Sequence, residues 1–133
     1  TLKINENFTQ LRDAALSGDR IKTNKLLDNT IINQDKNIFY LNLLNTRLLK
    51  LKEISKMPKN ENIELKLENL KPPIFWKDKP QFIIQSYKWT EKKLKDAQNK
   101  TFSCEVSIKS NSLINKNVLM KKLLIDVCQL ANS

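Results

Sequence analysis

Apolar residues recur three and four positions apart along most of the chain, and no other feature constrains its fold as strongly. This spacing is seen in Ile4, Phe8, Leu11 and Ala15, and again in Leu94, Ala97, Thr101, Cys104 and Ile108. Residues spaced in this way share one face of an α-helix. We therefore predict an all-α fold, a bundle of five or six helices that forms a single domain over residues 1–133.

Turn and capping residues indicate where the helices begin and end. The first is expected to stop at Ser17-Gly18-Asp19, where glycine suits the left-handed residue after a helix and aspartate can cap the next one. A second helix is expected at about Arg20 to Asn29, and another in whose first turn Pro80 sits. Thr90 is the predicted N-cap of the next helix, and the last one carries Val118 to Ala131.

The longest predicted helix opens at Gln34-Asp35 and ends at Met57-Pro58. Its apolar stripe comprises Ile38, Leu41, Leu44, Leu48 and Leu51, and is widened by Phe39, Leu43, Leu49 and Ile54. A helix that is apolar on more than one face is usually surrounded by other helices. We expect this helix to lie at the centre of the bundle.

The helical pattern weakens between residues 58 and 80. Part of this segment fits either an alternating strand or a short helix: Ile63, Leu65, Leu67 and Leu70. We favour the helix, because a lone strand would have no partner. Prolines 72, 73 and 80 surround Ile74-Phe75-Trp76 and predict an ordered turn. Its three large apolar side chains are expected to fold onto the bundle.

Composition excludes several classes of catalytic and cofactor site. The chain has no histidine, which removes histidine acid–base catalysis, Ser-His-Asp and Cys-His schemes, and zinc sites with imidazole ligands. A single glycine cannot supply a phosphate-binding loop or a dinucleotide fingerprint. Cys104 and Cys128 are too far apart for a CxxC pair, and two buried free thiols are favoured over a disulfide. We expect no enzyme activity, no metal and no cofactor.

The sequence also bears on where the protein resides. No apolar run reaches the ~18 residues of a membrane span, and no signal peptide is visible. We therefore expect a cytoplasmic protein. Because the chain begins at Thr1 rather than at methionine, we also expect it to be a piece of a longer polypeptide.

The chain is strongly basic, with a net charge of +10, and residues 71–133 account for +7 of it. A basic surface suggests contact with nucleic acid. However, 21 of the 24 basic residues are lysine, and lysine, asparagine and isoleucine are all favoured by AT-rich coding sequences. Arginine, which makes bidentate contacts to phosphate and guanine, is scarce. A hydrated surface is the favoured interpretation, and contact with nucleic acid is the alternative.

Three sets of residues are candidates for function. A lysine-rich run could contact phosphates, although a solvated outer face is favoured: Lys92, Lys93 and Lys95, with Lys88 and Lys100 nearby. An aromatic set could stack on unpaired bases, although core packing is favoured: Phe75, Trp76, Tyr87 and Trp89. The carboxylates of the second half show no metal-ligand spacing and receive no catalytic role: Asp78, Glu91, Asp96, Glu105 and Asp126.

Three stretches, in order along the chain, resemble one family. In Leu11 to Asp28, LRDAALSGDRIKTNKLLD, a helix ends in a Gly-Asp turn and a leucine-rich helix follows. Leu70 to Ala97 has a double proline, bulky residues and a basic residue, then a tryptophan before Ser/Thr: Pro72, Pro73, Phe75, Trp76, Lys77, Trp89 and Thr90. The closing pattern is Glu105, Lys109 and Lys121-Lys122-Leu123-Leu124-Ile125. Over about residues 5 to 131 the chain is similar to the C-terminal domain of the delta subunit of the bacterial DNA polymerase III clamp loader.

The resemblance implies a role in assembly. Clamp loaders are five-subunit AAA+ machines whose C-terminal helical domains form a closed collar. The chain would be the delta subunit's part of that collar, with delta-prime and gamma/tau as its partners. The parts of delta that contact the sliding clamp lie N-terminal to this domain, and delta is not an ATPase in this family.

The resemblance also implies that primer–template DNA lies nearby. In relatives the loop between the last two helices can approach the primer end, and here that region contains Lys109, Asn111, Ser112, Asn115 and Lys116. The alternative function is a free-standing basic helical domain that binds nucleic acid, because the second half carries most of the charge. A helical adaptor unrelated to replication is a third possibility.

Overall fold

The structure, a computed structural model, describes residues 2–29, 36–71, 73–110, 113 and 115–133. Over this range it is helical, with seven α-helices, the 3₁₀ turn η2 and no β-strand. The helices are α1 (Leu2–Leu16), α2 (Arg20–Asn29), α3 (Asn37–Lys56), α4 (Ile63–Glu68), α5 (Lys79–Lys88), α6 (Glu91–Ser110) and α7 (Lys116–Asn132), with the 3₁₀ turn η2 at Trp76–Asp78. The all-α prediction is confirmed, and the short α4 takes the number of helices above the expected five or six.

Most predicted boundaries are confirmed, and the caps show why. Gly18 follows α1 with φ at 74°, the left-handed conformation that glycine adopts without strain. Oδ1 of Asp19 accepts a hydrogen bond from the backbone N–H of Lys22 at 3.0 Å, and Oγ1 of Thr90 accepts one from Lys93 at 3.2 Å. The expected start of the long helix at Gln34-Asp35 lies outside the described residues. Its end before Met57-Pro58 agrees with α3.

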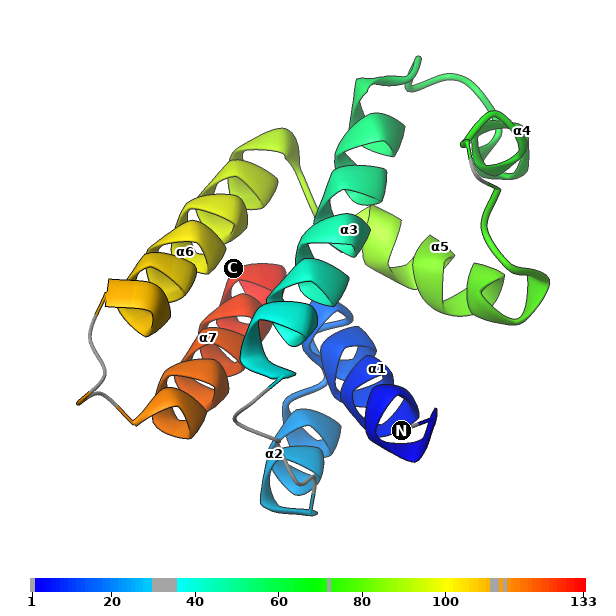
Figure 1. Cartoon of the computed structure of the whole chain (residues 1–133). Coiled ribbons are helices and arrows are strands. Elements are labelled where there is room, and N and C mark those ends of the chain that lie inside the picture. Colours follow the sequence, from blue (N-terminus) through cyan, green and yellow to red (C-terminus); the bar gives the residue numbers. More distant parts are fainter. Residues whose placement is uncertain (1, 30–35, 72, 111–112, 114) are drawn as a thin grey trace.

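α3 lies between other helices, as predicted, but they do not surround it: 42% of Phe39 and 47% of Leu49 is exposed. It packs against α1, α5 and α6, while α7 packs against α1, α2 and α6. Figure 1 shows α6 and α7 on one side of α3 and α4 and α5 on the other. The ring of Tyr40, on α3, stacks on that of Phe8, on α1, with centroids 4.5 Å apart. None of the described helices has the length and apolar character needed to cross a membrane.

The prediction that Ile74, Phe75 and Trp76 all fold onto the bundle is wrong. Ile74 is buried, but 58% of Phe75 and 67% of Trp76 is exposed. The reason is the 3₁₀ turn, closed by a hydrogen bond from the N–H of Asp78 to the carbonyl oxygen of Phe75 at 2.9 Å, which carries these two side chains away from the core. Core packing is also wrong for Tyr87, which is 76% exposed, and right for Trp89, which is buried.

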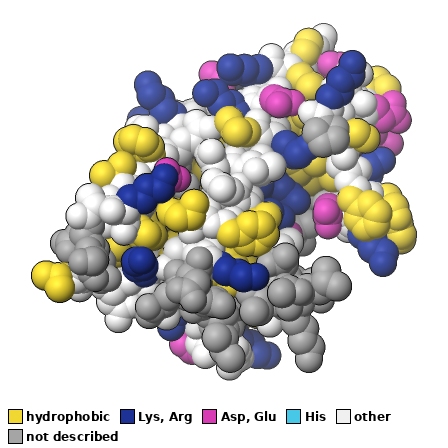
Figure 2. All heavy atoms as spheres, viewed as in Figure 1, with side chains coloured by type: hydrophobic (Ala, Val, Ile, Leu, Met, Phe, Trp, Pro, Cys, Tyr) yellow, Lys and Arg dark blue, Asp and Glu magenta, His cyan; other side chains and the backbone are white. Residues whose placement is uncertain are grey.

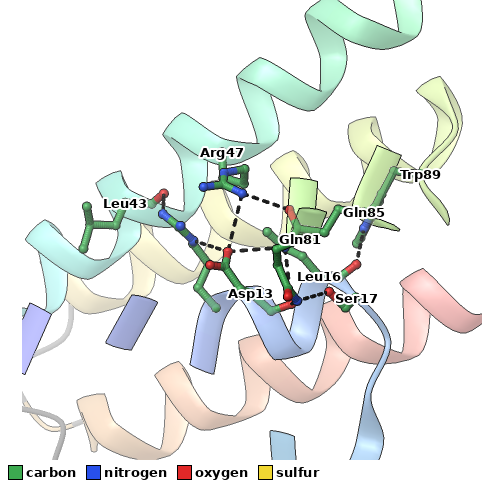
Figure 3. A network of polar contacts seen from close by, with 9 residues as sticks. Asp13, Leu16, Ser17, Leu43, Arg47, Gln81, Gln85 and Trp89 are labelled. Atoms are coloured by element: carbon green, nitrogen blue, oxygen red, sulfur yellow. Dashed lines mark hydrogen bonds and ion pairs between the residues drawn. The ribbon is translucent and has the colours of Figure 1, made fainter. Parts of the chain in front are cut away.

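A buried polar network joins α1, α3 and α5 (Figure 3), and Asp13 is its centre. Oδ1 of Asp13 lies 3.1 Å from Nε of Arg12 and 3.6 Å from Nη1 of Arg47. Gln85 donates to the same oxygen at 3.3 Å and accepts from Arg47 at 3.2 Å. Burial, and then the charge of Arg12, lowers the pKa of Arg47. The carboxylate of Asp13 thus forms ion pairs with two buried guanidinium groups.

The network continues to the end of α1 and along α5 (Figure 3). Nε2 of Gln81 donates to Oγ of Ser17 at 2.6 Å, and Nε1 of Trp89 donates to the carbonyl oxygen of Leu16 at 2.8 Å. The Trp89 bond satisfies a carbonyl in the last turn of α1, where helical partners run out. These contacts fix α5, and with it the turn that exposes Trp76.

Replacing Asp13 with alanine is expected to destabilise the fold strongly. The change leaves Arg12 and Arg47 buried without their carboxylate, and removing one partner of a buried ion pair costs roughly 3–5 kcal/mol. The free energy of unfolding, measured by urea denaturation with circular dichroism, checks this. The matched control is Glu105→Ala, which removes the exposed 3.1 Å pair with Lys109 and should cost about 0.5 kcal/mol or less. Equal losses for the two variants would contradict the prediction.

Candidate nucleic-acid interface

The residues expected near DNA between the last two helices are only partly available for it. Asn115 is the N-cap of α7: its Oδ1 accepts from the backbone N–H of Asn117 at 3.0 Å and of Val118 at 3.2 Å. Lys109 is exposed but pairs with Glu105, and Lys116 is half-buried. Asn111 and Ser112 lie outside the described residues.

The lysine-rich run divides into two groups. Lys92, Lys95 and Lys100 are exposed on α6, as the solvated-face interpretation predicts. Lys93 instead donates to the backbone oxygens of Lys88 at 3.2 Å and Ser133 at 2.7 Å. Part of the run therefore fastens the end of α7 to the α5–α6 junction and is not a surface for phosphate.

Phe75, Trp76 and Lys77 form an exposed aromatic corner before α5. The two rings are 5.9 Å apart at their centroids and tilted by 49°, and Nζ of Lys77 lies 5.5 Å from the centroid of the Trp76 ring. An ammonium group at this distance interacts with the face of the ring. The corner therefore combines two accessible π surfaces with a positive charge.

A hollow of about 350 Å³ lies beside Trp76, between α4 and the start of α5. Its walls include Leu67, Ile83 and Lys79, but also the carboxylates of Glu64 and Glu68 on α4. Phosphates would be repelled from the α4 side and attracted to the side of Lys77 and Lys79. The two sides of the corner therefore differ in charge. A base could stack against Trp76, while the phosphates would lie beside Lys77 and Lys79.

The chemistry of this corner suits stacking against a base and contact with phosphates, neither of which depends on base sequence. Aromatic side chains stack on any base, and lysines contact phosphates as point charges. Sequence reasoning named these aromatics as possible stacking residues but favoured their burial. The proline-rich turn could have indicated their exposure. Three consecutive side chains in such a turn point in different directions, so they do not all face the core.

Sequence reasoning missed a larger cleft of about 600 Å³. It lies between the end of α3, α4 and the α5–α6 junction, and its lining includes Ile54, Trp89 and Tyr87. Charged side chains of both signs surround it, among them Lys59, Lys92 and Glu61. Mixed charge of this kind suits a polyanion less well than the aromatic corner does.

No family model, curated protein or solved structure matches this chain. The resemblance to the clamp-loader family therefore rests on the residues quoted above. Among the described residues, no three Cys, Asp or Glu side chains come together in a way that could hold a metal ion. Both cysteines are free and buried, as predicted, and burial raises the pKa of the Cys104 thiol.

Trp76→Ala is expected to weaken binding of a labelled single-stranded oligonucleotide by about 5- to 150-fold, the equivalent of one stacked base. The fold should be retained, because most of the side chain is already exposed. Fluorescence anisotropy gives the affinity and circular dichroism the fold. Tyr87→Ala, an equally exposed aromatic outside the corner, is the control and should bind as the parent does. If Trp76→Ala binds the oligonucleotide as tightly as the parent does, the aromatic corner is not the binding site.

The Cys104 thiol is expected to react slowly with a thiol reagent near neutral pH. A raised pKa lowers the fraction of thiolate, which is the reactive form, below that of an ordinary cysteine, and the fraction recovers only at higher pH. In a Cys128→Ser background, reaction with Ellman's reagent should accelerate sharply once urea unfolds the chain. Rapid modification of the folded variant would contradict this.

Proposed function

We propose that this chain is the collar domain of the delta subunit of a bacterial DNA polymerase III clamp loader. In this role it helps to assemble the complex that loads the sliding clamp on primed DNA. Its partners are delta-prime and gamma/tau within the collar, with primer–template DNA nearby. The proposal gives the chain a scaffolding role and assigns no chemical step to it.

The observation that carries the proposal is that several residues of the first two resembling stretches stand at junctions between helices, whereas those of the closing pattern lie within α6 and α7. Gly18 and Asp19 end α1 and cap α2. Trp89 ends α5, is 4% exposed, and precedes Thr90, the cap of α6. Residues at such junctions determine how successive helices pack. Because these residues follow the family's pattern in the same order, they support a common arrangement of helices more strongly than amino-acid composition does. Pro72 lies outside the described residues.

The surface is also compatible with a place in a ring. A closed ring with head-to-tail contacts requires two different surfaces on each subunit. Large apolar side chains are exposed on several helices, including Ile21 on α2, Phe102 on α6 and Val118 on α7. Extensive apolar exposure of this kind is typical of a protein that has partners.

Co-purification tests the proposal. The chain is expected to co-elute with full-length delta-prime and gamma/tau in size-exclusion chromatography. Lys92→Glu together with Lys100→Glu, which reverses two exposed charges without touching the described polar network, should change assembly by less than about threefold. Failure of the folded parent chain to associate with folded partners would contradict the proposal.

The aromatic corner favours one alternative, a free-standing domain that binds nucleic acid. That function predicts tight binding of DNA by the isolated chain at physiological salt. The affinity should then fall steeply as salt rises. In a plot of the logarithm of the association constant against the logarithm of the salt concentration, each neutralised phosphate of a single strand contributes about −0.7 to the slope. The collar proposal instead predicts weak binding by the isolated chain. The salt series of the oligonucleotide titration separates the two.

A further inference from the structure

The outer surfaces of α3 and α6 carry a face whose centre has no charge. Its members are exposed and follow one stripe on each helix: Phe39, Asn42, Thr46 and Leu49 on α3, and Phe102 and Val106 on α6. We call this set the α3–α6 face. The two helices pack against each other (Figure 1), and Figure 2 shows hydrophobic side chains set among uncharged ones over both.

The α3–α6 face leaves a large amount of apolar surface in water. Phe102 is 67% exposed, Leu49 47%, Val106 45% and Phe39 42%. Thr46 adds little polarity, because its hydroxyl already donates to the carbonyl oxygen of Asn42 at 2.8 Å. Exposed charged residues stand only at the ends of these stripes: Glu53 follows Leu49, Lys95 precedes Phe102 and Lys109 follows Val106. Aromatic enrichment and loss of charge at the centre are the features of a protein–protein interface.

The dimensions of the two helices suit an interface. α3 and α6 have 20 residues each, so each is about 30 Å long, and packed helices lie 8–10 Å apart. The six residues extend about 15 Å along α3, so across two packed helices they cover roughly 300 Å² of the ~800 Å² that each partner contributes to a stable complex of standard size. Border residues such as Lys95 and Glu53 would supply the remainder.

The net charge selects the kind of occupant. Each chain carries +10, so two copies meeting at this face would repel each other. We propose that the α3–α6 face docks a neighbouring, unlike subunit whose contacting helices present an apolar, uncharged surface. This inference rests on the proposed function and names the face through which it acts. Burial of the four apolar side chains against that subunit supplies the driving force.

The decisive variant is Leu49→Glu with Phe102→Glu, which places two charges at the centre of the face. Its association with full-length delta-prime and gamma/tau is expected to weaken at least tenfold, about the loss caused by truncating central interface residues. The matched control is Leu65→Glu with Ile84→Glu. These residues are also apolar and are 51% and 49% exposed, but they lie on α4 and α5. The control should assemble as the parent does.

A third variant guards against misfolding. Thr46→Lys introduces one flexible charged side chain at an exposed helical position, which the fold tolerates. It should weaken assembly while its circular dichroism spectrum and urea midpoint match those of the parent.

The outcomes separate the inference from the proposed function. Failure of the parent chain to assemble overturns the proposed function, and this inference with it. Assembly by the parent with equal assembly by the face variants overturns only the inference. Light scattering gives a further test. If the parent chain forms a homodimer and the Leu49→Glu, Phe102→Glu variant does not, the inference is also overturned, because the face would then bind a second copy. Loss confined to the face variants supports the docking surface.

Discussion

The ion pairs of Asp13 with Arg12 and Arg47 fix how α1, α3 and α5 meet. Burial of apolar surface is not directional, and α5 buries little of it: only Phe82 and Gln85 on this helix are buried. The hydrogen bonds of Gln85 to Asp13 and Arg47 therefore give α5 a defined place that hydrophobic contact alone would leave loose. The position of the 3₁₀ turn immediately before α5 depends on this network, because that turn packs against α5.

α3 divides the two surfaces that the structure makes available for partners. On one side, α5 and the turn before it hold the aromatic corner beside lysines. On the other, α3 and α6 present an uncharged apolar face (Figure 1). Partners bound at the two surfaces would not compete, because the surfaces use different helices and different helix faces.

The helices and their caps could be predicted from sequence because they depend on local chemistry, as Gly18, Asp19 and Thr90 show. The exposure of Trp76 could not be predicted, because its hydrophobicity favours burial. Only the folded 3₁₀ turn shows that its side chain points away from the core. The polar network was missed because arginine usually faces water. One signal was present: Arg47 falls on the apolar stripe between Leu44 and Leu51. A charged residue on such a stripe indicates a buried partner.

The two tryptophans stand in opposite surroundings. The indole of Trp89 is 4% exposed and bonded to the backbone of α1, whereas that of Trp76 is 67% exposed beside Lys77. Indole emission shifts to longer wavelength in water, so the protein carries two built-in spectral reporters. Blue-edge emission follows the integrity of the interior, and red-edge emission, open to soluble quenchers, follows whatever covers the corner. Unfolding and ligand contact can thus be observed separately in one unlabelled sample.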